Sequence, residues 1–308
     1  MKRPLLSICV PTRNRSPLLA KMLENIVSLP TFLGSDEMEV VISDNASDDD
    51  TREVAMHHVE KFPGKIRYFC NSENVLDDNF RIALTRGEGE YLKLANDTLL
   101  FTDDGLKTML ETVRAHLEDR PLIYFRSLAG DFAPCRCKSL DELLRRVGVY
   151  VTWIAEYGIW RDDFAAIADF GRARDLWLIQ VDAQLREMAR KRDAVVVTRL
   201  FFVLQPRPVA GGGGNAAQIF GRNLCQLMKP YLATGELSRA TYEYVKWDAF
   251  LHCVFANFIS TKPGFVFRKD HYFKYLLPDF WWNWYIYAAY PFVVAARILA
   301  PLRRLVGK

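Results

Sequence analysis

A regular alternation of short apolar runs with helix-like stretches over the first 127 residues constrains the fold of this chain most. The runs, rich in apolar and β-branched residues, are expected to be strands; they lie at residues 5–10, 39–44, 66–71, 91–95 and 122–127. Helices are expected between them, at residues 16–29, 50–62, 77–86 and 104–117. Apolar strands separated by helices are typical of a mostly parallel sheet with helices on both faces. The sequence therefore predicts an α/β fold.

The pattern changes after residue 128. Residues 129–171 form short mixed segments rich in Trp and Tyr, and a helix at 175–191 and a strand at 194–204 are expected to follow. Four consecutive glycines at 211–214 predict a flexible loop that acts as a hinge or lid, and direct contact with a ligand is the alternative. Beyond them the chain is expected to be mainly helical. We therefore expect one domain at residues 1–210, with halves at 1–128 and 129–210, and a mainly helical region at 211–308.

Composition excludes several classes of protein. The net charge of +4, from 41 basic and 37 acidic residues, is too small to indicate a nucleic-acid-binding protein. Six cysteines with no C-x-x-C motif, and five histidines, predict reduced structural thiols rather than a zinc site. The N-terminus lacks the long apolar segment of a signal peptide, so a cytoplasmic location is expected.

Polar residues follow four of the expected strands, at the point where each strand ends. They lie at residues 11–15, 43–48, 71–74 and 96–98. Ligands of parallel α/β sheets bind outside the carboxyl ends of the strands, so these segments predict a site for a polar, phosphorylated ligand. The chain has neither G-x-G-x-x-G after Val10 nor a P-loop motif, which argues against a dinucleotide dehydrogenase and a P-loop NTPase. For any single loop, ordinary turn chemistry of Asp, Asn and Ser is the alternative.

Two of these segments resemble a known family. LSICVPTRNR at residues 6–15 and VISDNASDD at 41–49 resemble the opening of the family 2 glycosyltransferases, which have the GT-A fold. GEGEYLKL at 87–94 is similar to the segment that leads into the acidic metal motif of that family. GGGN at 212–215 with IFGRN at 219–223 resembles capsule and O-antigen sugar transferases. The resemblance covers residues 5–110 best and implies a nucleotide-sugar half at 1–128 and an acceptor half at 129–210.

The resemblance implies a nucleotide site at the strand ends. Pro11, Thr12 and Arg13 would line the base and ribose, and the forked guanidinium of Arg13 suits a diphosphate. Asp44 falls where the family uses an Asp to accept a hydrogen bond from the base, although it could instead cap a turn. Asn74 and Asn96 complete the implied nucleotide-binding set.

The implied metal site departs from the family pattern. The family presents two or three acids, whereas this chain reads Asn96-Asp97-Thr98, so Asp97 is the one anionic ligand expected for Mg²⁺ or Mn²⁺. These ions often take one or two protein carboxylates together with phosphate oxygens and waters. Donor binding without a metal is the alternative.

The implied general base is Asp182. It lies on the expected helix at 175–191, at the edge of a stripe formed by Trp177, Val181, Leu185 and Met188 that is expected to be buried. Pairing of Asp182 with Arg186, one helical turn away, is the structural alternative. Glu156 and Asp175 are held in reserve.

Aromatic residues precede that helix. Trp153 and Trp160, with Glu156 between them, are the candidates for contacts with the acceptor, and Tyr157 lies in the same stretch. Aromatic rings stack on sugars, but filling of the core explains them equally well.

The resemblance thus implies a cytoplasmic, inverting glycosyltransferase. Its donor would be a UDP-, GDP- or dTDP-sugar, and its acceptor a lipid-linked saccharide in the assembly of a surface polysaccharide such as capsule or O-antigen. A sugar nucleotidyltransferase and an inactive, membrane-associated scaffold with the same fold are the alternatives.

The C-terminal residues predict contact with a membrane surface. Residues 280–296 are apolar apart from Asn283 and rich in Trp and Tyr, and Pro291 is expected to interrupt their helix. Four basic residues follow, Arg297, Arg303, Arg304 and Lys308. Trp and Tyr favour the membrane interface and basic residues favour anionic lipids, so residues 280–306 are expected to form a peripheral anchor on the inner face of the cell membrane. Packing on the catalytic domain, or on a second subunit in a homo-oligomer, is the alternative.

Overall fold

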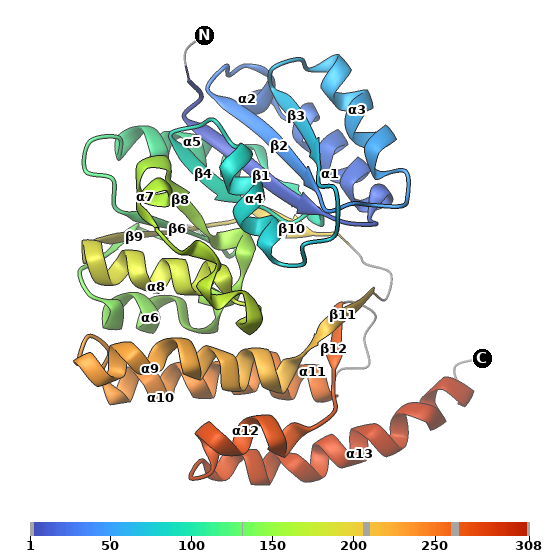
Figure 1. The fold of residues 1–308 in the computed structure, drawn as a ribbon, viewed down its shortest axis with the longest axis vertical. Coiled ribbons are helices and arrows are strands. Elements are labelled where there is room, and N and C mark those ends of the chain that lie inside the picture. Colours follow the sequence, from blue (N-terminus) through green and yellow to red (C-terminus); the bar gives the residue numbers. More distant parts are fainter. Residues whose placement is uncertain (1–2, 131, 206–209, 260–264, 307–308) are drawn as a thin grey trace. The chain divides into compact units, whose positions relative to one another are not determined.

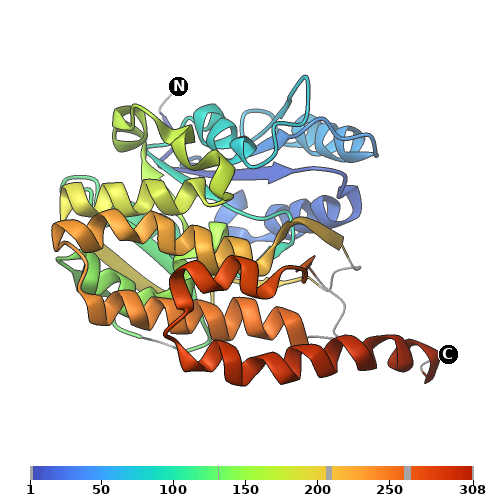
Figure 2. The same ribbon diagram turned by 60° about the horizontal axis from the view of Figure 1, so that its bottom comes forward.

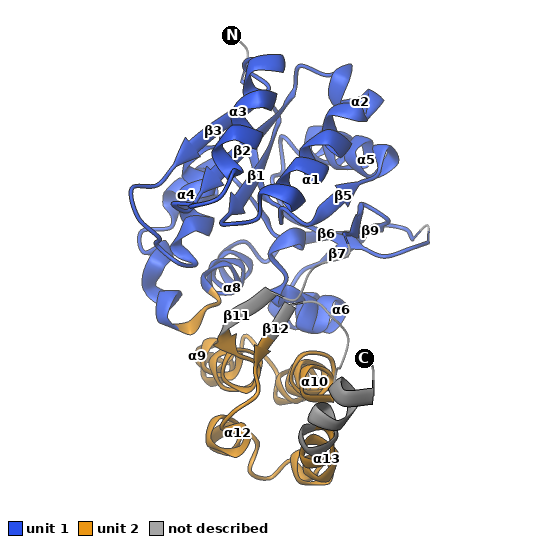
Figure 3. Ribbon diagram, turned by 90° about the vertical axis from the view of Figure 1, so that its right-hand side faces the viewer, with its two compact units in different colours: residues 1–175, 179–205 blue, residues 176–178, 206–308 orange. Residues whose placement is uncertain are grey.

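The computed structural model describes residues 3–130, 132–205, 210–259 and 265–306 (Figure 1). The chain divides into two compact units. Unit 1 comprises residues 1–175 and 179–205, and unit 2 comprises residues 176–178 and 206–308 (Figure 3).

The centre of unit 1 is a sheet with the strand order β3-β2-β1-β4-β8. Its first four strands are parallel and β8 (Gly158–Trp160) runs antiparallel to β4; the four are β1 (Leu6–Thr12), β2 (Met38–Asp44), β3 (Ile66–Cys70) and β4 (Tyr91–Leu94). Thr12 pairs with Asp44, and Asp44 pairs with Cys70, so the carboxyl ends of β1, β2 and β3 lie side by side. The predicted α/β fold with a mostly parallel sheet is confirmed.

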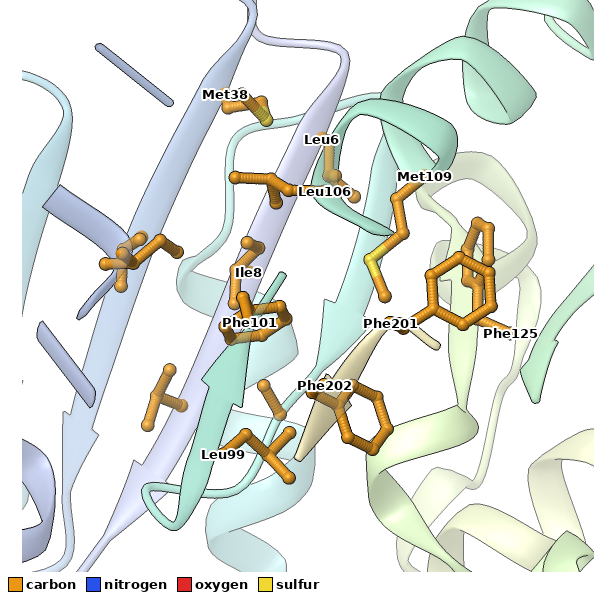
Figure 4. Packing of buried hydrophobic residues seen from close by; sticks show 14 of the residues in the cluster. Leu6, Ile8, Met38, Leu99, Phe101, Leu106, Met109, Phe125, Phe201 and Phe202 are labelled. Atoms are coloured by element: carbon orange, nitrogen blue, oxygen red, sulfur yellow. The ribbon is translucent and has the colours of Figure 1, made fainter. Parts of the chain in front are cut away.

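Helices cover both faces of this sheet because its strands present apolar residues on both sides. Leu6, Ile8 and Val10 belong to one buried cluster together with apolar residues of α1 (Ser16–Ser28) and α5 (Asp103–Ala115), as Figure 4 shows in part. The opposite face is covered by α4 (Asp78–Arg86), which contacts β1, β2 and β4. With α3 (Thr51–Lys61), each helix expected in the first 127 residues is present, with ends within two residues of the prediction.

Two of the expected strands lie outside the central sheet, and several further elements were not predicted from the sequence. The strand expected at 122–127, β6 (Leu122–Ser127), lies in a separate sheet, parallel to β9 (Ala194–Arg199) and without a place in the central one. Here β7 (Cys135–Cys137) pairs antiparallel with the other edge of β9. The strand expected at 194–204 is broken, because its last residues form β10 (Phe202–Leu204), which pairs with β5 (Leu99–Phe101). The helices α2 (Pro30–Leu33), α6 (Leu140–Val147) and α7 (Arg161–Ala166) in unit 1 were not predicted either.

Aromatic packing explains why the strand at 194–204 is broken. Phe201 and Phe202 both enter the core, where Phe201 packs edge-on against Phe125 and Phe202 against Phe101 (Figure 4). Both rings belong to one buried cluster, and successive side chains of a regular strand point to opposite faces, so the chain must turn to place both of them in it.

The expected helix at 175–191 begins later than predicted. It is α8 (Ile179–Lys191), preceded by a 3₁₀ segment at Phe170–Leu176. Trp177 has a φ of 60° and a side chain 37% exposed, so it does not belong to the buried stripe expected on this helix. Val181, Leu185 and Met188 are buried as expected.

Unit 2 is mainly helical. Its helices are α9 (Leu224–Thr234), α10 (Arg239–Ala249), α11 (Ala256–Ile259), α12 (Tyr272–Phe280) and α13 (Trp284–Val306), with π-helical turns at Ala217–Asn223 and Phe250–Phe255 (Figure 2). The glycines at 211–214 lie in β11 (Ala210–Asn215), which pairs with β12 (Phe265–Arg268), so the predicted flexible loop is wrong. Its partner strand lies about fifty residues further along the chain, so the sequence around the glycines does not indicate the pairing.

The C-terminal helix also differs from its prediction. The chain turns between α12 and α13, where Lys246 donates a hydrogen bond to the side chain of Asn283 (3.0 Å). Pro291 does not interrupt α13, which continues to Val306. Ile286 and Val293, on either side of Pro291, are fully buried, and this packing offsets the backbone hydrogen bond that proline cannot make. Among the described residues, no helix is long and apolar enough to cross a membrane.

Candidate active site

The loops after β1 and β2 are tied together at the carboxyl edge of the sheet. The backbone amide of Asn14 donates to the hydroxyl of Ser47 (2.9 Å), and that of Asp48 donates to the side-chain oxygen of Asn14 (2.8 Å). The amide of Ser16, at the start of α1, donates to Asp49 (2.9 Å). Asn14 has a φ of 49°, which places both of its polar groups toward the neighbouring loop. These contacts hold the two predicted ligand-binding loops together.

Asp44 is buried at the end of β2 and has several hydrogen-bond donors. One of its oxygens accepts from the amide (3.0 Å) and the hydroxyl (2.5 Å) of Ser47, and the other accepts from the hydroxyl of Tyr68 (2.7 Å). Burial and this carboxylate raise the pKa of Tyr68, so the phenol remains a neutral donor. The geometry is that of a capped turn, the alternative considered for this residue. A contact between Asp44 and a base remains a prediction.

Asn74 belongs to a network of amides that orders the loop after β3. Its side-chain oxygen accepts from Asn45 (2.8 Å) and from the amide of Leu76 (3.0 Å). Asn71 in turn donates to Asn45 (3.1 Å) and Asn79 (3.0 Å). In this structure Asn74 therefore shapes the loop, and its contact with a nucleotide remains a prediction.

Asp97 lies two residues beyond Ala95, whose amide pairs with β1, and is fully buried. The hydroxyl of Thr12 donates to one carboxylate oxygen (2.9 Å), and the guanidinium of Arg15 pairs with the other (3.1 Å). The loops after β1 and β4 are therefore joined by a hydrogen bond and an ion pair. The side-chain oxygen of the adjacent Asn96 is buried and has no hydrogen-bond partner among the described residues.

The donor set at Asp97 does not fit the predicted metal site. Mg²⁺ and Mn²⁺ need several oxygen ligands, and here a single carboxylate is present with both oxygens engaged by protein donors. Asn96 would add one neutral oxygen. Among the residues that the structure describes, no group of three or more His, Cys, Asp or Glu side chains could hold a metal ion.

Arg13 and Arg15 differ in their environments. Arg15 is paired with Asp97, whereas the half-buried Arg13 forms no ion pair with a carboxylate in the described part of the chain. The sequence reasoning assigned the diphosphate to Arg13 and gave Arg15 no role. The spacing of the motif could not reveal the contact of Arg15, because its partner lies 82 residues away.

The predicted base, Asp182, is buried in the first turn of α8 between two guanidinium groups. Arg172 donates to both of its oxygens at 2.7–3.1 Å, and Arg186 pairs with it at 2.9 Å. The pairing with Arg186 considered from the sequence is present. Arg172, from the irregular segment before α8, was missed because no helical periodicity links it to Asp182.

The aromatic candidates for the acceptor side are mostly core residues. Trp160 is fully buried, donates its indole N–H to the carbonyl of Pro121 (2.7 Å) and packs edge-on against Tyr91, so it has no face open to a sugar. This prediction is therefore wrong. Trp153 is partly buried and packs against Phe202 at a centroid distance of 5.7 Å.

Glu156 is also buried and accepts a hydrogen bond from the amide of Ser127 (3.2 Å). Burial raises its pKa to about 7. Tyr157, close to it in sequence, is fully buried too. The short 3₁₀ turn that carries Glu156 thus faces the interior, and the structure does not bring this carboxylate together with Asp182 or Asp97 in any contact.

The fold matches that of proteins of known structure. The structure is similar to solved glycosyltransferases with the GT-A fold. A mannosyltransferase from Pyrobaculum calidifontis, solved with GDP-Man and Mn²⁺, matches with a TM-score of 0.57 and 16% identity over 97% of this chain and 88% of its own. Residues 1–349 of TarS from S. aureus, solved with UDP-GlcNAc, match with a TM-score of 0.53 and 15% identity over 84% of this chain and 76% of that one. At such identities the likeness shows the fold alone.

Part of the sequence matches a known family. Residues 7–120 match glycosyl transferase family 2, so the resemblance seen in the early motifs is confirmed for this segment of the chain. A validoxylamine A glucosyltransferase from Streptomyces hygroscopicus subsp. jinggangensis is 35% identical over 196 residues, which are 57% of this chain and 42% of that protein. An abequosyltransferase from Salmonella typhimurium is 32% identical over 122 residues, 39% of this chain and 34% of that protein.

A glucosyltransferase from Campylobacter jejuni, named for a GalNAc(5)-diNAcBac-PP-undecaprenol substrate, is 29% identical over 110 residues, 35% of this chain and 34% of that protein. The chain thus spans less than half the length of each of these three relatives.

Proposed function

We propose that this protein transfers a sugar from a nucleotide-sugar donor to an acceptor hydroxyl. The observation that carries the proposal is the meeting of the loops after β1 and β4 at one edge of the sheet, where Thr12 and Arg15 contact Asp97. Ligands of parallel α/β sheets bind outside this edge. The related proteins with this fold include enzymes solved with GDP-Man and UDP-GlcNAc, which supports a nucleotide sugar as the ligand.

Residues 1–128 are proposed to bind the donor and residues 129–210 the acceptor. Arg13, which has no carboxylate partner among the described residues, would contact the diphosphate, since a guanidinium forms forked hydrogen bonds to phosphate. The countercharge of the diphosphate has two candidate sources. One is a divalent ion at Asp97, as predicted from the sequence and supported by the mannosyltransferase of similar fold solved with Mn²⁺; the other is the guanidinium of Arg15.

Asp182 is proposed as the general base of an inverting transfer. It would take the proton of the acceptor hydroxyl while the oxygen bonds to the anomeric carbon and the nucleoside diphosphate leaves from the opposite face with the electron pair of the broken bond. Both oxygens of Asp182 now accept from Arg172, so the acceptor must displace this arginine. Arg172 is 48% exposed, whereas Arg186 is 22% exposed, so Arg172 is the partner on the solvent side of Asp182.

A lipid-linked saccharide is the proposed acceptor, as the name of the Campylobacter jejuni relative suggests. The exposed aromatic side chains at the start of α13 support a membrane surface as a partner of unit 2. Trp281, Trp284 and Phe292 are 63%, 73% and 63% exposed. Trp at such positions favours the interfacial zone of a bilayer.

A panel of UDP-, GDP- and dTDP-sugars tests the proposed function. Incubation with undecaprenyl-diphosphate-linked saccharides should release one nucleoside diphosphate and yield a lengthened saccharide, and NMR of the product should show an inverted anomeric centre. Formation of pyrophosphate from a sugar phosphate and a nucleoside triphosphate would instead identify a nucleotidyltransferase. Absence of nucleotide binding and of turnover would leave the inactive scaffold.

A further inference from the structure

The carboxylate of Asp97 is used as an anchor. Its side chain is 1% exposed, and its two oxygens are divided between Thr12, the last residue of β1, and Arg15, in the loop that follows. Its backbone carbonyl accepts from the side chain of Gln205 (3.3 Å), beyond β10. Asp97 therefore joins three segments of unit 1, and its lone pairs point at protein donors.

The guanidinium of Arg15 has N–H groups that its contact with Asp97 does not use. A guanidinium carries five N–H groups in a planar fork, and the contact with Asp97 occupies the Nη1 end. The Arg15 side chain is 31% exposed although its partner is buried, so Arg15 lies partly at the surface at the carboxyl edge of the sheet. A cation that is held by a buried carboxylate loses less side-chain freedom on binding an anion than a mobile surface arginine does.

We propose that Arg15 supplies the fixed positive charge that holds the donor diphosphate, and that the nucleotide binds without a divalent ion. The inference rests on the proposed function, since it concerns the same donor. In it Asp97 is a positioning residue, which fixes the guanidinium of Arg15 through one oxygen and the hydroxyl of Thr12 through the other. The guanidinium meets the diphosphate with its remaining N–H groups, and Arg13 adds a second cation from the same loop.

The two sources of countercharge give opposite expectations for Asp97→Asn. A metal ligand cannot be replaced by an amide without losing most of the ion's affinity, so a metal-dependent donor would no longer bind. If Asp97 positions Arg15, the asparagine oxygen still accepts from the guanidinium, and nucleotide affinity should fall only about threefold. Arg15→Ala should lower nucleotide affinity at least tenfold, both in EDTA and in Mn²⁺.

Calorimetric titration of the full chain with UDP, GDP and dTDP, in EDTA and in Mn²⁺, is the test. We expect one nucleotide to bind with dissociation constants that agree within about twofold in the two buffers. Arg15→Ala leaves a buried carboxylate without its cation and could impair folding, so the double variant with Asp97→Asn is titrated as well. It should bind at least threefold more weakly than Asp97→Asn alone. Arg52→Ala, an exposed arginine on α3, is the matched control and should bind as the wild type does.

Nucleotide binding that requires Mn²⁺ and disappears in Asp97→Asn would overturn the role of Arg15 while leaving the proposed function intact. Equal binding by the double variant and Asp97→Asn would also overturn it. A wild-type protein that binds none of the three nucleotides in either buffer would contradict the proposed function itself.

Discussion

At the residue scale, a feature of unit 1 is a pair of ionisable side chains buried behind the candidate site. Lys93, on β4, donates to the carbonyl oxygens of Leu94 (2.8 Å) and Ala155. Burial lowers its pKa to about 7 and, as described above, raises that of Glu156 to the same region. Such groups lose hydration on folding, and the lost hydration makes stability depend on pH.

Glu156 makes stability decline with rising pH. Because its folded-state pKa lies above its usual value of 4.5, its contribution is fully present below pH 4.5 and is lost as pH rises toward 7. The shift corresponds to a loss on the order of 3 kcal/mol. Urea unfolding at pH 5 and pH 7 should show a smaller decline in the free energy of unfolding for Glu156→Gln than for the wild type. Parallel declines in the two proteins would contradict the assignment. Lys93 has the opposite effect in a different pH range. Above pH 7 the loss of its proton raises the free energy of unfolding, whereas Glu156 lowers this free energy below pH 7.

The paired carboxylate Asp182 is open to a kinetic test. Asp182→Asn should leave the nucleotide dissociation constant nearly unchanged and lower turnover by roughly 10²–10⁴-fold, because the amide accepts no proton from the acceptor. Arg172→Ala should lower KM for the acceptor while retaining turnover, because the acceptor no longer has to displace this guanidinium from Asp182. An Asp182→Asn variant with wild-type turnover would reduce this residue to a structural ion pair.

At the element scale, the close approach of β1 to the turn before β4 depends on a glycine. The amide of Gly89 donates to the hydroxyl of Ser7 (2.7 Å), and a Cβ at this position would lie 2.7 Å from the Ser7 amide nitrogen. Only hydrogen fits there, so the register of β4 beside β1, and with it the position of Asp97, depends on this residue.

Gly89→Ala should therefore destabilise unit 1 by about 1–3 kcal/mol, the usual cost of overpacking a core. Denaturant titration followed by Trp fluorescence measures the change. Gly171→Ala is the control, because its Cβ would meet its nearest neighbour at an ordinary 3.4 Å. Equal stability of the two variants would mean that the strands can move apart at no cost.

At the scale of the whole molecule, the surface of unit 2 around the turn between α12 and α13 is unusually aromatic for a protein in water. Trp281, Trp282 and Trp284 are all more than 40% exposed. Large exposed apolar groups of this kind mark interaction surfaces. The sequence of α13 continues into Arg297, Arg303 and Arg304, which is the charge expected next to an anionic leaflet.

Replacement of Trp281 and Trp284 by Ser should reduce sedimentation with vesicles that contain anionic lipid several-fold, without loss of stability, since both side chains are mostly exposed. Leu33→Ser, on α2 in unit 1 and 51% exposed, is the matched control and should sediment as the wild type does. A wild-type protein that never binds the vesicles, or a double variant that binds them equally well, would favour a contact with protein instead.

The sequence alone determined the α/β fold and the edge of the sheet that carries the candidate site. Both follow from local patterns: a strand needs a short apolar run, a helix needs its periodicity, and the loops after parallel strands must share one edge. This is why Thr12, Asp44 and Asp97 were found at strand ends before any contact was known. The family resemblance added roles that no local pattern supplies.

Tertiary structure alone decided what each of those residues touches. Arg15 and Asp97 lie 82 residues apart, and Arg172 reaches Asp182 from outside its helix, so neither pair has a signature in sequence spacing. Trp160 is a core residue because β8 pairs with β4, and the glycines at 211–214 form a strand because β12 lies beside them. Contacts between distant segments depend on the packing of the whole unit, so local patterns in the amino-acid sequence do not predict them.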